Sequence, residues 1–436
     1  MFRSILHSLV AASLWALPVV AQLTDLDDLV QEALEANPSL AVLESRIEAY
    51  QDRSSYVSAP PDPVLRFDLL NVPLGSFGRD RTPMSGNQIA LQQSLPFPGS
   101  LKAKGIVALE AAKAVEGRLV YKQASITSLV KIAYYDLSFF DQAIRITREN
   151  QALTRAILER TLTRYEVGLG GQHDVLRARV ALTLLTNRLT GFRTSRRLAE
   201  VRLNGLLGRA PDSVLETRTQ IHVHQVDVSA SQLLEVSVDN SGSIEELDHL
   251  TLEWRAREQA AQKSALPSFT INLSYRQRSS VPGDPVNGED FFSAGFGLNI
   301  PVFRGRKQLA LASEARAHVR WIAARQEETR QKIATEIQRI QVEMDLHKSE
   351  HELFSREILP QTEQALLSVR SAYEADLVEF SYLLNAQSTW LDAKLMSFHH
   401  RVVHAKLLAE LEAVVGTNLQ GLSDHKHTGI SDGGKP

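Results

Sequence analysis

The sequence predicts a mainly α-helical protein that is duplicated internally and carries a small transmembrane β portion. Three observations lead to this fold class. The chain repeats itself at an offset of 208 residues, the spacing between Tyr165 and Tyr373. Apolar residues at 3–4 spacing predict helices far longer than those of ordinary globular domains. Four short stretches alternate strictly between apolar and polar residues, as half-buried strands do.

The duplication is carried by a motif near the middle of each half. Arg164–Leu169 (RYEVGL) recurs as Ala372–Leu377 (AYEADL). Further pairs match at the same offset: Leu176 and Leu384, Ala178 and Ala386, Leu203 and Leu411, and Gly208 and Gly416. Such a repeat indicates one supersecondary unit used twice. We therefore expect a first repeat over 22–208, a linker over 209–242, a second repeat over 243–416 and a polar C-terminal tail over 417–436.

Each repeat is expected to begin with a helix (about 24–58 and about 243–265) and to end in a long helical hairpin (about 101–208 and about 305–416). At 1.5 Å per residue, outgoing helices over about 101–167 and 305–375 would each reach roughly 100 Å. Pro360 should kink the second of them. The first return helix carries a coiled-coil seam, which Arg196 interrupts: Val175, Ala178, Leu182, Leu185, Leu189, Phe192, Ala199, Leu203 and Leu206. The second seam has a polar middle at Ser397, His400 and His404, and its apolar members are Leu383, Ala386, Trp390, Ala393, Leu407, Leu411 and Val414.

Two β-hairpins are predicted, over about 63–96 and about 268–301. Their apolar residues occupy every second position: Leu65, Phe67, Leu69, Ile89, Leu91, Phe269, Ile271, Leu273, Tyr275, Phe292, Ala294, Phe296, Leu298 and Ile300. Each stretch has the length of a transmembrane β-strand, with one face suited to lipid and one to a wet lumen. A soluble two-sheet domain would show the same alternation and is the alternative.

Four strands cannot close a barrel, and open edges are not tolerated in lipid. About eight strands make the smallest closed barrel, with an interior filled by side chains. Pooling strands from two copies would reach that number, whereas three copies would give twelve strands and room for a lumen. A conducting protein should therefore be a homotrimer with a 12-stranded β-barrel.

Composition and the N-terminus limit the class of protein. The 48 Lys and Arg nearly balance the 51 Asp and Glu, so no nucleic-acid partner is indicated. The chain has no cysteine, which excludes disulfides and thiolate metal sites. Arg3 precedes an apolar run, Ile5–Val20, that ends at the small residue Ala21. We interpret residues 1–21 as a signal peptide, with a retained anchor helix as the alternative. No second run is long enough for a transmembrane helix.

The order of these features resembles the TolC-like outer-membrane efflux family, the outer-membrane factors, over nearly the whole mature chain. The residues that carry the resemblance are Ala33–Leu40 (ALEANPSL), Pro96 and Pro301 at the strand exits, and Arg164–Leu169 followed by Asp174-Val175-Leu176. The resemblance implies a trimeric barrel in the outer membrane of a Gram-negative bacterium and a helical tunnel in the periplasm. Equatorial elements would use 209–242 and the tail after Gly416.

In this family the protein is the passive exit duct of a tripartite pump. It is joined by a periplasmic adaptor to an inner-membrane transporter, here expected to be of the RND type. Asp62–Leu65 and Gln92–Gly99 look most like the heavy-metal and cation efflux (CzcC/CusC-like) branch. Drug efflux and type I secretion remain alternatives.

The resemblance implies that the hairpin tips, 165–176 and 373–384, dock the adaptor and close the aperture. The residues assigned to these roles are Tyr165, Val167, Gly168, Leu169, Asp174, Tyr373, Asp376, Leu377, Tyr382 and Asn385. Asp174 is expected to accept a hydrogen bond from Tyr373 across neighbouring hairpins, with ordinary helix-end capping as the alternative. Gly168, Gly170 and Gly171 should supply the backbone freedom that a tight reversal needs. Tyr382 and Asn385 stand where the family often has acidic residues that collect cations, which puts an acidic ring in doubt. Asp376 and Glu379 lie nearby, with a solvated face as their simpler interpretation.

No catalytic residue, cofactor site or metal site is predicted. His400 and His404 share a helix face, and His222 with His224 and His425 with His427 form alternating pairs, but a clear third ligand is missing. No nucleophile motif or acid–base pair is found, so the chain is not expected to be an enzyme. A non-conducting coiled-coil scaffold of the envelope is the competing function, but it would need no apolar strand pairs.

Overall fold

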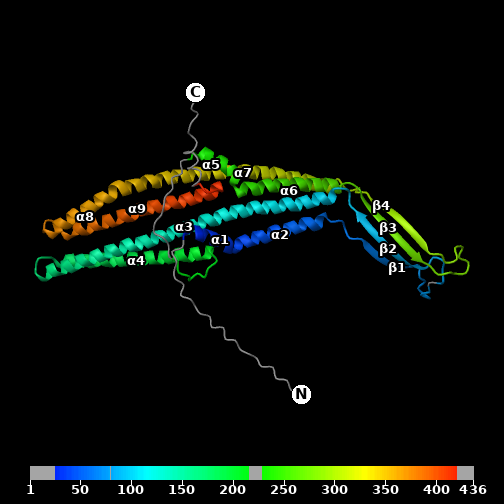
Figure 1. The fold of residues 1–436 in the computed structure, drawn as a ribbon, viewed down its shortest axis with the longest axis horizontal. Helices are drawn as coiled ribbons and strands as arrows, with labels where there is room; N and C mark the ends of the chain where they lie inside the picture. Colours follow the sequence, from blue (N-terminus) through cyan, green and yellow to red (C-terminus); the bar gives the residue numbers. More distant parts are fainter. Residues whose placement is uncertain (1–24, 79, 216–227, 420–436) are drawn as a thin grey trace, which may run out of the picture. The chain divides into compact units, whose positions relative to one another are not determined.

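The computed structural model describes residues 25–78, 80–215 and 228–419, and its fold is mainly helical with one small antiparallel sheet (Figure 1). The first repeat contains α1 (Leu26–Ala36), α2 (Pro38–Ser58), α3 (Ser100–Glu166) and α4 (Gln172–Leu206). The expected linker contains α5 (Ala230–Asn240). The second repeat contains α6 (Gly242–Ser264), α7 (Gln308–Leu353), a π-helical segment (Phe354–Ile358), α8 (Leu359–Glu374) and α9 (Phe380–Val415). The expected signal peptide, 1–21, lies outside the described residues. So do residues 216–227 of the expected linker and 420–436 of the expected C-terminal tail.

Local sequence explains the boundary between α1 and α2. Asn37 has extended backbone angles, and its side-chain oxygen accepts a hydrogen bond from the Ser39 N–H at 3.0 Å. Pro38 follows at the first helical position, where a missing N–H costs nothing. The helix expected over about 24–58 is therefore two helices, separated at a cap that the sequence Asn37-Pro38 encodes.

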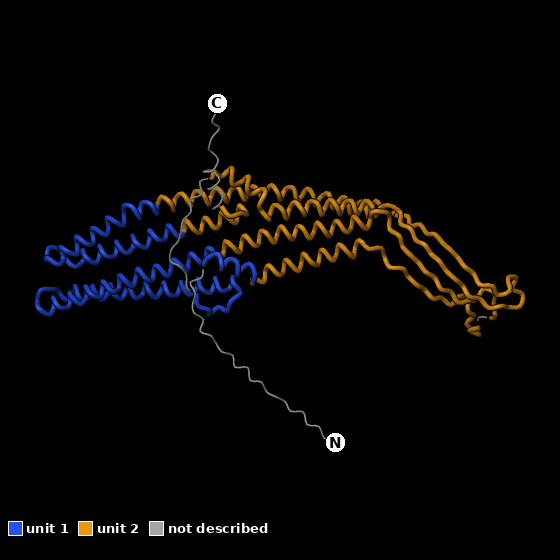
Figure 2. Tube along the Cα trace, in the orientation of Figure 1, with its two compact units in different colours: residues 1–35, 130–222, 350–402 blue, residues 36–129, 223–349, 403–436 orange. Residues whose placement is uncertain are grey.

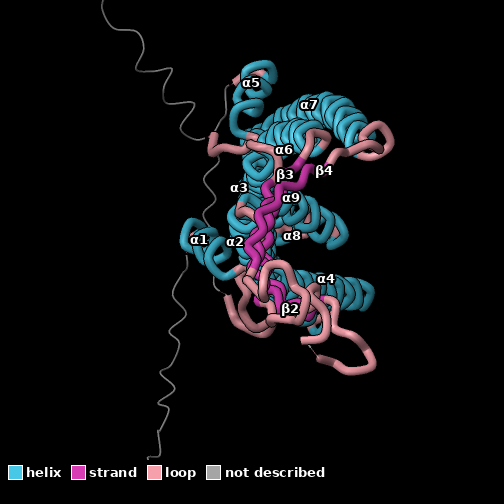
Figure 3. Tube along the Cα trace, turned by 90° about the vertical axis from the view of Figure 1, so that its right-hand side faces the viewer, coloured by secondary structure: helices cyan, strands magenta, loops and turns pink. Residues whose placement is uncertain are grey.

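The sheet is a meander of four strands in the order β1-β2-β3-β4, all antiparallel. They are β1 (Val64–Leu70), β2 (Gly86–Leu95), β3 (Ser268–Gln277) and β4 (Phe291–Asn299), which are labelled in Figure 1; Figure 3 draws the strands in magenta. The register places the alternating apolar residues in rows on one face. One row is Leu65, Leu91, Leu273 and Ala294, and the next is Phe67, Ile89, Tyr275 and Phe292. These rows remain open to the surroundings, with Phe67 73% and Phe292 71% exposed.

The chain divides into two compact units, each of which draws segments from both sequence repeats (Figure 2). Unit 1 comprises 1–35, 130–222 and 350–402, and contains both hairpin tips. Unit 2 comprises 36–129, 223–349 and 403–436, and contains the sheet. The main core of unit 2 joins α5, α6, α7 and α9 through Leu233, Ile244, Ile337, Ile340 and Leu411. Unit 1 packs α3 against α9 through Ala143, Ile146, Leu391 and Leu395.

Both predicted seams face the helical packing. Every member of the first seam is buried or half-buried. Arg196, the polar interruption, forms an ion pair with Asp141 at 2.6 Å and donates to the Leu215 carbonyl at 2.8 Å. These partners explain why a charged residue is tolerated at a seam position.

The second outgoing helix is interrupted at the expected proline. The π-helical turn Phe354–Ile358 comes directly before Leu359 and Pro360. A proline ring clashes with the carbonyl four residues earlier, and it lacks the N–H that this carbonyl would bind. A wider turn relieves that conflict, so the perturbation takes the form of a local π-bulge. Across the described ranges, none of the helices qualifies as a membrane span by its length and hydropathy.

Candidate functional site

The two hairpin tips of unit 1 have the same backbone cap. After α3, the N–H of Leu169 donates to the Arg164 carbonyl at 2.8 Å, and that of Gly168 to the Tyr165 carbonyl at 3.0 Å. After α8, Leu377 donates to Ala372 at 2.9 Å and Asp376 to Tyr373 at 3.2 Å, each pair displaced by the repeat offset. This is the Schellman arrangement, which requires a left-handed residue directly after the helix.

The left-handed residue differs between the tips. It is Gly168 in the first, with φ of 77°, and Asp376 in the second, with φ of 59°. Asp is one of the few residues with a side chain that tolerates this region. Of the three glycines expected to provide backbone freedom, only Gly168 uses it, because Gly171 caps α4 with extended angles (φ −90°) and Gly170 has no positive φ. The expectation for Gly170 and Gly171 was therefore wrong.

Arg164 connects the two tips. Its guanidinium forms an ion pair with Asp376, donates to the Leu169 carbonyl at 3.3 Å, and lies 5.6 Å from the centroid of the Tyr373 ring. One turn earlier, Arg160 pairs with Glu374 at 2.8 Å. In both of these pairs the first hairpin supplies the cation and the second the carboxylate. The two pairs link one hairpin to the other inside a single chain.

Beneath the ion pairs lies an apolar cluster formed by all four helices of the tips. Tyr373 and Phe380 are its aromatic members, with ring centroids 5.5 Å apart. Ala178 comes from α4, and Ile157 and Leu158 from α3 pack against them. The Tyr373 hydroxyl lies 3.4 Å from Thr161 Oγ1. Tyr373 is therefore a core residue of its own chain, and among the described residues Asp174 is not its partner.

Asp174 has another contact. Its carboxylate lies 3.2 Å from His173 Nε2, and it stands in the first turn of α4, where a negative charge is favourable. Because the cap residue is Gly171, which makes no side-chain cap bond, the alternative of helix-end capping by Asp174 was wrong.

The remaining predicted tip residues form an exposed apolar surface. Val167 is 63%, Leu169 68% and Leu377 78% exposed, and Tyr165 is also exposed. The two leucines occupy equivalent positions of the two caps. Tyr382 and Asn385 are exposed on the first turns of α9, so both positions are open but uncharged.

A buried polar layer next to the tips was not predicted. Gln387, which is 3% exposed, donates through its amide nitrogen to the Asn150 side chain and, at 2.7 Å, to Thr154 Oγ1. Its amide oxygen is buried and has no hydrogen-bond partner among the described residues. The layer borders a cavity of about 360 Å³ between α3, α4 and α9. The one feature of the sequence that could have indicated this layer is the polar residue Gln387 between the seam residues Leu383 and Trp390.

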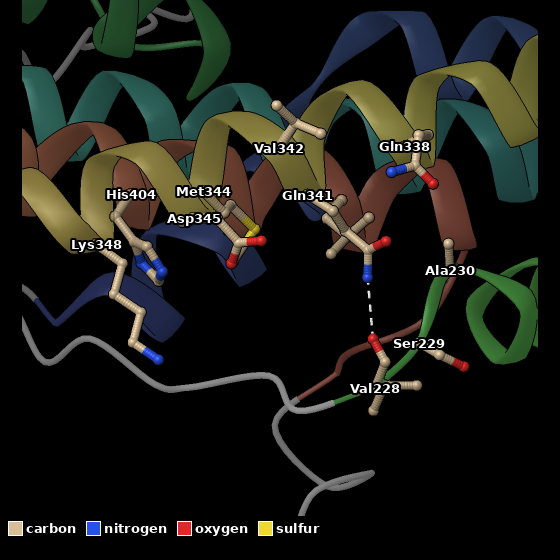
Figure 4. A pocket seen from close by; sticks show the side chains of 11 residues that line it. Val228, Ser229, Ala230, Gln338, Gln341, Val342, Met344, Asp345, Lys348 and His404 are labelled. Atoms are coloured by element: carbon tan, nitrogen blue, oxygen red, sulfur yellow. Dashed lines mark hydrogen bonds between the residues drawn. The ribbon is translucent and has the colours of Figure 1, made fainter.

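Unit 2 contains a polar pocket of about 280 Å³, shown in Figure 4. Asp345 and Lys348 of α7 and His404 of α9 line it, and Gln341 donates to the Val228 carbonyl at 2.9 Å. That bond fastens the chain before α5 to α7.

The predicted histidine face is buried, with His400 8% and His404 5% exposed. His400 lies beside the ring of Phe354, with centroids 5.4 Å apart. Within the described residues, no group of three or more His, Cys, Asp or Glu side chains is arranged to hold a metal ion. His222, His224, His425 and His427 lie outside the described residues.

Comparison with known proteins gives a consistent result. Residues 29–209 match the family model of the outer membrane efflux proteins. A curated relative, the outer membrane efflux protein BepC of Brucella suis biovar 1 (strain 1330), is 22% identical over 178 residues. That match spans 41% of this chain and only 38% of BepC.

Solved structures share the fold over most of the chain. The outer membrane protein VceC of Vibrio cholerae is 18% identical with a TM-score of 0.73, covering 90% of this chain and 96% of VceC. CusC, described as forming a transmembrane channel, is 15% identical with a TM-score of 0.73, covering 90% of this chain and 92% of CusC. The equal scores do not distinguish one branch of these channels from another.

Proposed function

We propose, from the match of residues 29–209 to the family model of the outer membrane efflux proteins, that this chain forms one third of a passive exit duct in the outer membrane. Three copies would pool their sheets into a 12-stranded barrel, and their helical hairpins would form the periplasmic tunnel. The observation that carries the proposal is the sheet, whose apolar face is exposed and whose two outer edges lack a partner strand among the described residues.

The sheet supports pairing with further copies on physical grounds. The free edges of β1 and β4 present unpaired N–H and C=O groups, which lipid cannot satisfy. Joining β4 of one copy to β1 of the next would satisfy them and leave no open edge. The aligned apolar rows would then contact lipid, and the opposite face, with Arg66, Asn272 and Gln92, would line the lumen.

The tips support a docking role. Exposed apolar residues at a chain reversal cost solubility unless a partner covers them. A periplasmic adaptor protein would cover Val167, Leu169 and Leu377. The adaptor would in turn join an inner-membrane transporter of the RND type. Tyr165, Asp376, Tyr382 and Asn385 would contribute the polar rim.

The aperture would be held partly between copies. Because Tyr373 is buried in its own chain, a hydrogen bond between its hydroxyl and Asp174 would have to form with a neighbouring copy and in competition with Thr161. We retain this pairing as part of the proposal.

The cargo is proposed to be heavy-metal cations, on the resemblance of Asp62–Leu65 and Gln92–Gly99. The neutral Tyr382 and Asn385 argue against an acidic ring at the entrance, so selection would lie in the transporter. A deletion strain challenged with copper, zinc, cobalt, nickel and a drug panel tests this. Sensitivity to metals alone supports the proposal, whereas sensitivity to drugs alone supports drug efflux and refutes it.

Fractionation tests the duct itself. We expect the protein in the outer membrane as a trimer that resists detergent and dissociates on heating. A monomer in the soluble periplasmic fraction would refute the proposal.

A further inference from the structure

Basic side chains gather where the helices of unit 2 meet the sheet. The chain passes between helix and strand four times. Together with the adjoining turns of α3, α6 and α7 and the last residues of β2 and β4, these passages span 59–63, 95–107, 259–267 and 299–313. These segments contain six cations and one carboxylate, Asp62. We call the six cations the basic junction: Lys102, Lys104, Lys263, Arg304, Arg306 and Lys307.

The basic junction is unpaired. Within the described residues, none of its six side chains forms a hydrogen bond or an ion pair. Further along the same helices cations do have partners, as in Arg316 with Glu258 at 3.7 Å. The side chain of Lys263, at the end of α6, lies against Gly99 at the start of α3. Cations from separate segments therefore share one level of the unit, without the carboxylates that would neutralise them.

The junction also exposes apolar residues. Directly before Arg304, Ile300 is 60%, Val302 75% and Phe303 68% exposed. They continue from the strand β4 into the turns that precede α7. An apolar segment next to a run of cations is the pattern of a membrane–water interface, where side chains enter the acyl region and charges meet headgroups.

We propose that the basic junction binds the phosphate groups of anionic phospholipids in the periplasmic leaflet, with Val302 and Phe303 inserted beside them. This inference rests on the proposed placement of the sheet in the outer membrane. Two features favour a lipid surface as the occupant. The apolar rows of the sheet end at the junction, so a membrane around the sheet would bring its headgroups to this level. Excess positive charge without internal partners is complementary to phosphate.

The test uses the full-length assembly purified in detergent and titrated with phosphatidylglycerol or phosphatidylethanolamine, with bound lipid counted by native mass spectrometry. The wild type should bind the anionic lipid about five-fold more tightly, and 0.5 M salt should weaken that preference. Arg304→Gln/Arg306→Gln/Lys307→Gln should reduce the preference to less than about two-fold.

The matched control is Arg255→Gln/Arg320→Gln/Arg330→Gln. It removes the same charge from positions of α6 and α7 that are exposed and, over the described ranges, have no ionic partner. It should retain the preference. If the triple junction variant fails to assemble, Lys102→Gln/Lys104→Gln should still lower the preference. No preference in the wild type, or an equal loss in the control, overturns the inference. Fractionation separates the two proposals, because a protein that resides in the outer membrane without preferring anionic lipid refutes only this one.

Discussion

Arg164, in the last turn of the first outgoing helix, forms an ion pair with Asp376, the left-handed residue in the turn of the second hairpin. Asp376 occupies the position in the second repeat that Gly168 occupies in the first. In the second repeat the left-handed cap residue is therefore also the ionic partner of Arg164. The pair joins two hairpins that are more than 200 residues apart in the sequence. A duct with its entrance at the tips would rely on such contacts to keep the entrance narrow.

We expect Arg164→Gln to increase leakage through the proposed duct. Asp376 is 65% exposed at its side chain, so the pair should be worth at most about 1 kcal/mol and the variant should fold normally. The measurement is the sensitivity of an expressing strain to large antibiotics that the outer membrane normally excludes. Asp376→Asn, which tolerates the left-handed turn, should act equally, and the double variant should add nothing. The control is Arg155→Gln, because Arg155 is exposed on α3 and has no partner among the described residues. Leakage equal to that of the control would contradict the role of Arg164.

The proposed bond between copies makes a separate prediction. Asp174→Ala should raise leakage of large antibiotics, and Tyr373→Phe should do the same without disturbing the core, because only the hydroxyl is removed. If the Tyr373 hydroxyl bonds only to Thr161 of its own chain, neither Tyr373→Phe nor Thr161→Val will change the sensitivity to antibiotics. Normal sensitivity of a well-expressed Asp174→Ala strain would refute the bond.

The spacing of apolar residues along the sequence predicted most of the helices and strands, because it shows which face of each element is buried. Leu65, Phe67 and Leu69 alternate in sequence since a strand turns every second side chain to the same face. The seam through Val175, Ala178 and Leu182 follows from helix geometry in the same way. Both patterns involve only residues that are close in sequence, so they can be recognised without knowledge of the tertiary structure.

Contacts between the hairpins could not be predicted, because they depend on how two distant segments meet. Nothing near Arg164 indicates that its partner is Asp376. The repeat alignment did contain one unused signal, an aspartate in the place of a turn glycine. The alternative of a helix cap at Asp174 was wrong for a related reason, because Gly171, with extended backbone angles, takes the cap position three residues earlier.

The buried polar layer should hold α3 and α9 in register. Gln387→Leu would leave the Asn150 side chain without its buried partner, which should cost about 1–3 kcal/mol. Polar residues at seam positions commonly fix register, so the variant should also lose cooperativity. Thermal unfolding by circular dichroism measures both effects. Asn150→Leu/Thr154→Val/Gln387→Leu should recover stability by removing every unpaired group. Ser388→Ala, an exposed change at the same cavity, should be neutral, and a Gln387→Leu protein as stable as the wild type would argue against the layer.

The stability of unit 1 should depend on pH through Glu200. Its side chain is 3% exposed, and it accepts hydrogen bonds from the Leu215 N–H at 2.8 Å, from Arg197 at 2.7 Å and from Arg196 at 3.3 Å. Burial opposes ionisation of the carboxyl, but these donors outweigh it and lower the pKa of Glu200 below its usual range. Since the unfolded chain then binds the proton more tightly, the carboxylate stabilises the fold above the pKa of an unfolded glutamate. This contribution is lost as the pH falls through the lowered pKa.

Glu200→Gln should therefore lower the free energy of unfolding by about 1–3 kcal/mol at pH 7, because a buried set of donors loses its negative partner. The gap between the variant and the wild type should narrow steadily on acidification, since protonation makes the two side chains alike. Thermal unfolding of both proteins at pH 7 and pH 3 measures the gap. The control is Glu159→Gln, because the Glu159 carboxylate is exposed on α3 and has no partner within the part of the chain that the structure describes. This variant should show no gap at either pH. A gap that stays constant between the two values would mean that Glu200 stabilises unit 1 by its shape rather than by its charge.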